Sequence, residues 1–361
     1  MLRTAIASTL AAFAAADINE DFGDLLQGRE DLHATHFEPI WAQYKAEFEG
    51  QSPVDLDEDA MFNFFENVDK IITHNKQEDK KFSQGINAFS AMTFEQFAEH
   101  FHLKDNKENA PQNCSATGRA SPLTTAGNDD VPDSWDWSKH GGVSPVKDQG
   151  NCGSCWTFST VGCLESAHLI DFGRLETYAE QQLVDCAGDF DNFGCDGGLP
   201  SHAFEYVHFN GGITTEAAYP YKGVDQTCTV DSSTYKLSVG HAMNITEGDE
   251  VELKAAVFKQ PVSVAFDCED DFMNYSSGVY SSTNCKNGPA DVNHAVLAVG
   301  YGTDETTGMD FWYVKNSWST TWGDKGFFKI ERGVNMCGIA QCNSYPESVN
   351  EINGGIQFWS N

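Results

Sequence analysis

Three side chains suited to nucleophilic chemistry stand in the second half of the chain. Cys155 lies in the stretch QGNCGSCWTF, His294 in VNHAVLAVGYG, and Asn316 in WYVKNSW. A thiolate attacks a carbonyl carbon, an imidazole delivers the proton to the leaving amine, and an amide can fix the tautomer and tilt of that imidazole. His294 follows Cys155 by about 140 residues, a separation at which such partners meet only in the folded protein.

The segment that begins at Cys155 is predicted to be a helix over residues 155–171. Its apolar residues recur at helical spacing and fall on one face: Phe158, Val161, Gly162 and Leu169. Gly173 supplies a stop signal. Cys155 would then occupy the first turn, where free backbone N–H groups, the helix dipole and a nearby imidazolium can lower a thiol pKa to roughly 3.5–7.5.

The spacing Cys152-x-x-Cys155 has two other interpretations, a redox dithiol and half of a zinc site. A zinc site would need a second ligand pair, and a dithiol would need a compact fold of alternating strands and helices around it. Similarly, His294 could be a structural residue of a strand, and Asn316 could be a strand-end residue in a turn.

Together these stretches resemble the papain family of cysteine peptidases over about Val131–Pro346. The CGSCW signature and the residues flanking His294 and Asn316 carry the resemblance. It implies an α+β fold of two subdomains with a cleft between them. Helices around Cys155 would form the left half, and antiparallel strands would form a right half that resembles a β-barrel. A helical inhibitory pro-domain would precede both.

The resemblance also assigns residues that support the reaction. The side-chain amide of Gln149 and the backbone N–H of Cys155 would form an oxyanion hole, because both can point at the oxygen that becomes negative. Trp318 would shield the hydrogen bond between the asparagine and the histidine from water. The family usually has glycine after this tryptophan, whereas this chain has Ser319, which would alter the local backbone.

Two adjacent glycines, Gly197 and Gly198 in the stretch CDGGLP, resemble the family's substrate-binding segment. Their bare backbone would let an extended peptide substrate pair with it. An ordinary turn accounts for the two glycines as well.

Eleven cysteines indicate disulfides in an oxidising compartment, and the odd count leaves at least one thiol unpaired. Spacing alone does not give the connectivity. The resemblance implies three bridges: Cys152 with Cys195, Cys186 with Cys228, and Cys285 with Cys337. The resemblance gives Cys163 and Cys268 no bridging partner, so buried free thiols are the simplest interpretation, and a bridge between them stays open.

Residues 1–16 are predicted to be a secretory signal peptide. Arg3 precedes an apolar stretch that ends in three alanines before Asp17. No later run is long and apolar enough to span a bilayer, so we expect a soluble mature protein without a membrane partner.

Residues 17–109 are predicted to be the inhibitory pro-segment. Four residues share one helical face, as in the ERFNIN pro-segments of the family: Phe64, Asn67, Ile71 and Asn75. Leu56 and Ala60 stand where that motif has Glu and Arg, and Ala91 replaces the usual Asp. An amphipathic core helix gives the same spacing. We expect the segment to cover the cleft until it is cut away, with fewer or weaker acid-sensitive salt bridges than in relatives.

Residues 110–117, which contain PQNCSAT, resemble the retained mini-chain of cathepsin H, the closest group within the family. Cys114 would tether the mini-chain to Cys342. A mini-chain in the non-primed cleft would leave room for about one substrate residue before the scissile bond. Its carboxylate, at or near Thr117, would pair with a free α-ammonium group, which makes the enzyme an aminopeptidase. The insertion 286–291 resembles a loop that narrows the same side.

Residues 118–130 would be a linker removed on processing, and residues 131–361 would be the peptidase domain. In the alternative interpretation, 110–130 is only a glycosylated linker rich in Gly, Ser and Thr. Three Asn-x-Ser/Thr sites are glycosylation candidates: Asn113, Asn244 and Asn274.

The composition fits a folded acidic protein, with 40% hydrophobic residues to fill a core. Lys and Arg number 22 against 54 Asp and Glu, and the net charge of −32 would repel nucleic acid and anionic membranes. It suits an acidic lumen, where protonation relieves repulsion, although a charge excess also serves solubility. We therefore expect a lysosome or acidic vacuole, or secretion.

The resemblance implies a monomeric thiol peptidase that needs no metal or organic cofactor. Thiolate attack would give an oxyanion, His294 would protonate the leaving amine, and water would hydrolyse the thioester. Peptides and proteins would be substrates, and the pro-segment and cystatin-like proteins would be inhibitors. Two alternatives are an endopeptidase that has lost the mini-chain and a non-catalytic peptide-binding relative.

Overall fold

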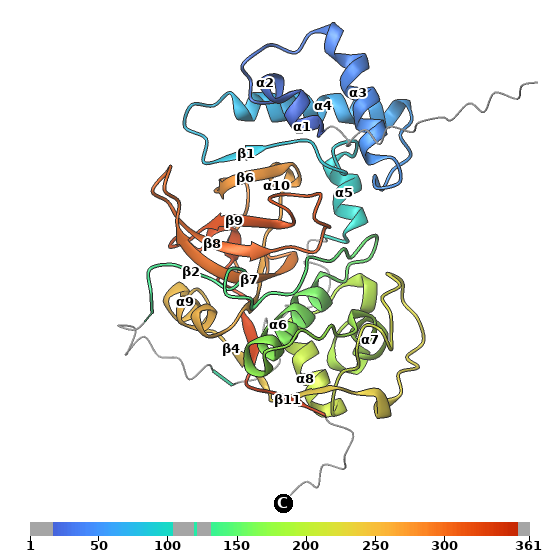
Figure 1. Cartoon of the computed structure of the whole chain (residues 1–361), viewed down its shortest axis with the longest axis vertical. Coiled ribbons are helices and arrows are strands. Elements are labelled where there is room, and N and C mark those ends of the chain that lie inside the picture. Colours follow the sequence, from blue (N-terminus) through green and yellow to red (C-terminus); the bar gives the residue numbers. More distant parts are fainter. Residues whose placement is uncertain (1–16, 104–118, 121–130, 353–361) are drawn as a thin grey trace, which may run out of the picture.

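The computed structural model describes residues 17–103, 119–120 and 131–352 (Figure 1). The predicted signal peptide, the mini-chain, most of the linker and the end of the C-terminal tail lie outside the described residues.

Residues 17–103 form a helical unit with a core of its own. Its elements are α1 (Ile18–Asp21), α2 (Gly23–Leu26), α3 (Ala34–Phe48), α4 (Glu58–Asn75), strand β1 (Phe82–Gln84) and α5 (Phe94–His100). The side chain of Asp57 caps α4 by accepting a hydrogen bond from the backbone of Ala60. The predicted shared face of α4 is confirmed, since Phe64, Asn67, Ile71 and Asn75 are all buried.

The helical half of the remaining chain is built around α6 (Cys155–Phe172). Its other elements are α7 (Glu180–Cys186), α8 (Pro200–Asn210) and the short helices η2 (Gly188–Phe190), η3 (Gly194–Asp196) and η4 (Ser232–Thr234). The helix α6 ends at Gly173, which adopts a left-handed φ of 71°. Its burial is wider than the predicted single face, because α6 contacts α7 and α8 as well as strands β5 and β7.

The other half is a large sheet. Its further strands are β2 (Trp135–Asp136), β4 (Ala242–Asn244), β5 (Val262–Phe266), β6 (Tyr275–Tyr280), β7 (His294–Thr303), β8 (Asp310–Lys315), β9 (Phe327–Glu331) and β10 (Ser344–Pro346). The order is β1-β6-β9-β8-β7-β5-β10-β4, with β2 on β7. All pairs are antiparallel except β6 with β9. The two-part α+β fold is confirmed, but within the described residues the sheet does not close, so the barrel-like expectation is corrected to an open sheet.

The remaining elements are α9 (Glu250–Lys259), α10 (Asp270–Met273), η5 (Met336–Gly338) and a small sheet of β3 (Leu237–Val239) with β11 (Val349–Glu351). The strand β11 belongs to the C-terminal tail, for which the sequence offers no role. Pairing with β3 places Glu351 beside His168 and Arg174, so this part of the tail closes the end of the helical half.

The pro-segment docks by adding β1 to the exposed edge of β6 (Figure 1). Gly278 of β6 makes the approach possible: its φ is 87°, and a Cβ there would lie 2.7 Å from the Cα of Phe82. The side chain of Asn87 donates to the carbonyl of Met273 at 3.0 Å, and Lys70 pairs with Asp270 at 3.0 Å. The contact therefore combines backbone pairing and neutral hydrogen bonds with apolar packing, because Phe82, Phe89 and Phe97 of the pro-segment belong to the main hydrophobic core.

Candidate active site

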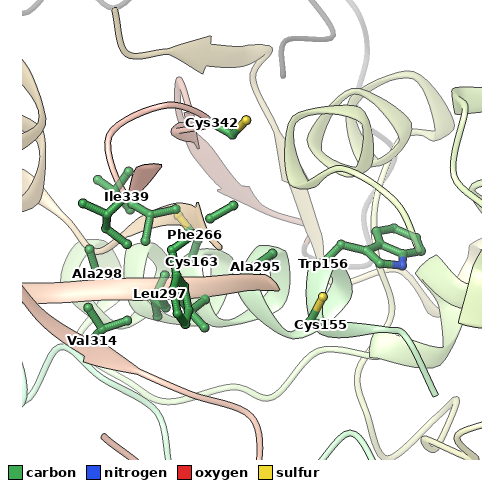
Figure 2. Packing of buried hydrophobic residues seen from close by; sticks show 14 of the residues in the cluster. Cys155, Trp156, Cys163, Phe266, Ala295, Leu297, Ala298, Val314, Ile339 and Cys342 are labelled. Carbon is green, nitrogen blue, oxygen red and sulfur yellow. The ribbon is translucent and has the colours of Figure 1, made fainter. Parts of the chain in front are cut away.

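Cys155 is the first residue of α6 and lies beside the start of β7, next to Ala295 (Figure 2). The backbone N–H groups of Ala295, Trp156 and Cys155 favour a thiolate, but burial is the larger effect and raises the pKa of the Cys155 thiol. The predicted lowering of this pKa is therefore wrong for the form described, in which the pro-segment is present.

His294 opens β7, and Asn316 directly follows β8, the neighbouring strand. Nε2 of His294 lies 2.8 Å from Oδ1 of Asn316, and because an amide oxygen only accepts, this nitrogen carries the proton. Nδ1 is buried and has no partner among the described residues. The neutral ring therefore presents a lone pair at Nδ1, the form that can take a proton from a thiol.

A stack of aromatic rings covers His294. The indole of Trp318 lies parallel to the imidazole, with ring centroids 4.6 Å apart. Two rings of the pro-segment also contact Trp318. The ring centroids of Phe101 and Phe97 lie 4.7 and 5.1 Å from that of Trp318. His294 is only 1% exposed, and burial lowers its pKa to about 4 even though the hydrogen bond to Asn316 raises it.

Gln149 is buried near the start of α6. Its amide nitrogen donates to the carbonyl of Cys152 at 3.0 Å, and its Oε1 accepts from Oγ of Ser317 at 2.7 Å. The amide N–H₂ group has two hydrogens, so one N–H remains for a further acceptor. Ser319 has a φ of 66°, so serine holds the left-handed conformation that the family's glycine would adopt there.

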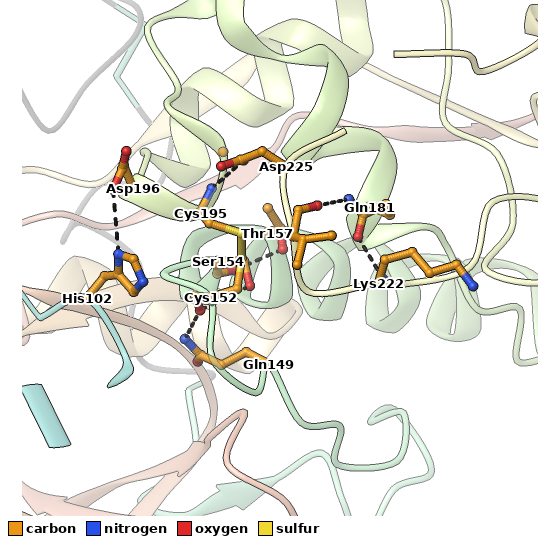
Figure 3. The surroundings of a disulfide bond; sticks show 12 residues. His102, Gln149, Cys152, Ser154, Thr157, Gln181, Cys195, Asp196, Lys222 and Asp225 are labelled. Carbon is orange, nitrogen blue, oxygen red and sulfur yellow. Dashed lines mark hydrogen bonds and ion pairs between the residues drawn. A yellow bond between two sulfur atoms is a disulfide. The ribbon is translucent and has the colours of Figure 1, made fainter. Parts of the chain in front are cut away.

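The two glycines after η3 differ in their surroundings. Gly197 has a φ of 115°, and a Cβ there would meet open space. Gly198 is packed instead, because a Cβ would lie 2.7 Å from the ring of Trp156. Figure 3 shows that His102 of the pro-segment reaches this region, where its Nδ1 lies 3.5 Å from Oδ1 of Asp196.

Three disulfides join the pairs that the resemblance implies: Cys152 to Cys195, Cys186 to Cys228, and Cys285 to Cys337. Cys155, Cys163 and Cys268 are free thiols, so the open possibility of a bridge between the last two is excluded in this structure. Cys342 is disulfide-bonded, and the residues proposed with it, Cys114 and Thr117, lie outside the described residues.

The three glycosylation candidates differ in how exposed the structure leaves them. Asn274 is 3% exposed, and its Oδ1 accepts a hydrogen bond from Ser90 of the pro-segment at 2.8 Å. A glycan must extend into solvent, so Asn274 is corrected to a contact residue of the pro-segment. Asn244 is half-buried in β4, and Asn113 lies outside the described residues.

A buried group of charged side chains behind the site is the feature that sequence reasoning missed. Glu165 lies within α6 and is 0% exposed, with lysines from two other segments close by. A carboxylate in the middle of an apolar helix is a signal that a buried partner exists, because an unpaired buried charge is strongly unfavourable.

Two negative findings apply to the described residues alone. In this part of the chain, no group of His, Cys, Asp and Glu side chains is placed to hold a metal ion. Of the helices in residues 17–103 and 131–352, none is both long enough and apolar enough to cross a bilayer.

The sequence profile described as "Papain family cysteine protease" matches residues 131–347. Pro-cathepsin H from Medicago truncatula is 52% identical over 286 residues, which cover 78% of this chain and 78% of that protein. Pro-cathepsin H from Mus musculus is 50% identical over 285 residues, which cover 78% and 82% of the two chains.

A solved structure with a pro-segment is also similar. Digestive procathepsin L 3 from the larval midgut of Tenebrio molitor is 35% identical and superimposes with a TM-score of 0.75, over 86% of this chain and 98% of that chain. The shared region therefore includes the pro-segment as well as the two-part domain. The profile, the relatives and the common fold together establish that this chain belongs to the papain family of cysteine proteases.

Proposed function

We propose that this chain is the zymogen of an acidic-compartment thiol peptidase that acts through Cys155, His294, Asn316 and Gln149. The hydrogen bond between Nε2 of His294 and Oδ1 of Asn316 carries the proposal. It fixes the tautomer in which Nδ1 is free to accept the thiol proton. The papain-family match and the position of Cys155 at the start of α6 support the same assignment.

The reaction follows from these groups. Nδ1 of His294 takes the proton of Cys155, and the sulfur attacks the substrate carbonyl carbon. The oxygen becomes negative and accepts hydrogen bonds from the amide of Gln149 and the backbone N–H of Cys155. The imidazolium then protonates the leaving amine, which leaves a thioester, and water activated by the same ring hydrolyses it. Gly197, Gly198 and Trp318 would line the substrate's path.

A finer proposal concerns selectivity: the mature enzyme acts mainly as an aminopeptidase, with some endopeptidase activity. It is supported by relatives named pro-cathepsin H and by Cys342, which is disulfide-bonded, while the other described cysteines are either paired with one another or free. We infer that Cys114 is its partner and that residues 110–117 remain attached. Residues 17–109 and 118–130 would be removed. The signal peptide and the acidic charge support a lysosomal or vacuolar destination, with secretion as an alternative.

The nucleophile and the oxyanion donor can be tested by substitution in the activated enzyme. Cys155→Ser should abolish hydrolysis, and Gln149→Ala should lower kcat by about a hundredfold or more, because one oxyanion donor is lost. The measurement is kcat with peptide substrates, normalised to folded protein. Gln182→Ala, which removes another buried glutamine in the helical half, should leave kcat unchanged. Full activity of Cys155→Ser would rule out the mechanism.

The mini-chain can be tested by releasing it. In Cys342→Ser, kcat/KM for dipeptide amides with a free amine should fall about tenfold, because one charge-assisted contact of about 1.4 kcal/mol is lost. Hydrolysis of N-acetylated peptides should rise, because the released mini-chain no longer blocks the cleft. Non-reducing mass spectrometry of the wild type should show a Cys114 peptide bound to Cys342. Cys163→Ser, which removes a free buried thiol, is the control. An unchanged substrate ratio would favour a plain endopeptidase.

In the zymogen the pro-segment covers the site, and we call this the closed form. The closed form should open as the pH falls from about 6.5 to about 4. Burial lowers the pKa of His294, and burial followed by the nearby His102 charge lowers that of His100, each to about 4. A histidine whose pKa is depressed by closure stabilises the closed form above its ordinary pKa near 6.5, and this stability is lost as pH falls toward 4. Iodoacetamide labelling of Cys155 in the uncut zymogen should therefore accelerate across this window.

His100 provides the matched variant for this experiment. In His100→Asn, one of the two titrating rings is gone, so labelling should rise less steeply with acid. His140→Asn, which changes an exposed histidine outside the pro-segment, should follow the wild type. Labelling that does not depend on pH between 7 and 4 would contradict this account of opening.

A further inference from the structure

Four charged side chains meet in the interior behind the candidate active site: Lys147, Glu165, Glu180 and Lys315. We call them the buried charge cluster. Nζ of Lys147 lies 2.7 Å from Oε1 of Glu165 and 2.5 Å from Oε1 of Glu180. Glu165, Glu180 and Lys315 are 0%, 1% and 7% exposed. Charges are buried at this depth only when they are paired and hydrogen-bonded, so the cluster constrains the positions of every element that contributes to it.

Ser144 links Lys315 to the carboxylates. Its Oγ donates to Oε2 of Glu165 at 2.5 Å and accepts from Nζ of Lys315 at 2.9 Å. Lys315 ends β8 in the sheet, whereas Glu165 and Glu180 come from α6 and α7 in the helical half. The buried charge cluster therefore fastens the two halves to each other, and it does so at the base of the site.

Both lysines are close in sequence to groups of the site. Lys315 directly precedes Asn316, and Lys147 stands two residues before Gln149. The two segments are also joined through Ser317, whose carbonyl accepts from the backbone of Gln149 at 3.0 Å and whose Oγ donates to the Gln149 side chain. A shift of either lysine is thus transmitted to the asparagine, the oxyanion donor or both.

A small cavity of about 20 Å³ lies among these groups, lined by all four members of the buried charge cluster and by Asn316. Nδ2 of Asn316 is buried and has no hydrogen-bond partner among the described residues. The volume suits a single water molecule, and the charged and amide groups on one part of the lining could hydrogen-bond it. The amide that contacts His294 therefore borders the same cavity as the cluster.

Burial and the neighbouring charges shift the pKa values of the ionisable groups in and around the buried charge cluster. Burial lowers the pKa of Lys315, the nearby Glu165 charge partly opposes this effect, and the resulting pKa is about 8. For Lys147, burial works against protonation, but Glu180 and Glu165 raise its pKa above the ordinary value. Glu216 lies near Glu180, and burial raises the pKa of both carboxyls. In acid both lysines are charged, so Ser144 and Glu165 hold Lys315 in place.

We propose that the buried charge cluster and Ser144, which links its members, position residues for catalysis: they hold Asn316, and through it the imidazole of His294, in the geometry that the reaction needs. The proposal rests on the proposed function of this site. None of these residues touches the substrate, so their loss changes the chemical step and leaves substrate binding intact.

The test uses the full zymogen, activated and titrated with a thiol-directed inhibitor so that rates refer to competent sites. Ser144→Ala removes only the link between Lys315 and Glu165, and Lys315→Met removes the charge at similar length. Each should lower kcat by about ten- to a hundredfold, because misplacement by about 1 Å costs about a hundredfold. KM should change less than about twofold, since ground-state binding is untouched.

A pH profile separates positioning from simple loss of structure. The rate of Cys155 alkylation should show its acid limb at higher pH in both variants, because an imidazolium that Asn316 no longer holds in place stabilises the Cys155 thiolate less and the thiol pKa rises. Lys329→Met is the matched control: Lys329 lies in the next strand, pairs with Asp304 at 3.1 Å and does not belong to the cluster. This control should keep the wild-type kcat and profile.

Two results would overturn the proposal. One is a wild-type kcat per titrated site with an unshifted acid limb in both Ser144→Ala and Lys315→Met. The other is a loss confined to the number of titratable sites, which would make the cluster purely structural. A wild-type enzyme that neither reacts with the inhibitor nor hydrolyses peptides would instead refute the proposed function itself, so the two failures are distinguishable.

Discussion

The hydrogen bond between Nε2 of His294 and Oδ1 of Asn316 is the interaction on which the site depends. At 2.8 Å it decides which ring nitrogen carries the proton, and so which one keeps a lone pair. It joins the first residue of β7 to the residue after β8. The bond can therefore form only if these two neighbouring strands pair in the correct register. Trp318 stacks on the ring at 4.6 Å and keeps water away from this bond.

The pro-segment acts on the same interaction through burial. Its aromatic rings, Phe97 and Phe101, extend the stack over Trp318, and its strand β1 occupies the edge of β6. In this low-dielectric setting burial favours the neutral forms of the Cys155 thiol and the His294 ring, and it outweighs the backbone N–H groups at the start of α6. The thiol and the ring are therefore both neutral in the described form, and we propose that removal of the pro-segment readmits water and lets them ionise.

Sequence patterns anticipated the local features well. Gly173 and the spacing of apolar residues predicted α6 to within one residue, and the three- and four-residue steps predicted the buried face of α4. These features follow from helical period and turn chemistry, which are local. The resemblance added the three cysteine pairs, which spacing alone does not provide.

The features that were missed depend on what lies across space. The sign of the Cys155 pKa shift depends on how deeply the folded chain buries the thiol, and Asn274 is a contact of Ser90 in the pro-segment. The open sheet follows from strand pairings between distant segments, including one parallel pair. The residues of the buried charge cluster come from four separate segments, so no periodic pattern within one segment predicts it.

The central claim is that His294 is neutral with its proton on Nε2 in the covered form and becomes an imidazolium once the cleft opens. Nitrogen-15 NMR of histidine-labelled zymogen and matured enzyme at pH 6 tests it directly. The account predicts the Nε2–H tautomer before maturation and two protonated ring nitrogens afterwards, with Nδ1–H paired to a Cys155 thiolate and Nε2–H still bound to Asn316. A proton on Nδ1 in the zymogen, or a neutral ring in the matured enzyme, would contradict it.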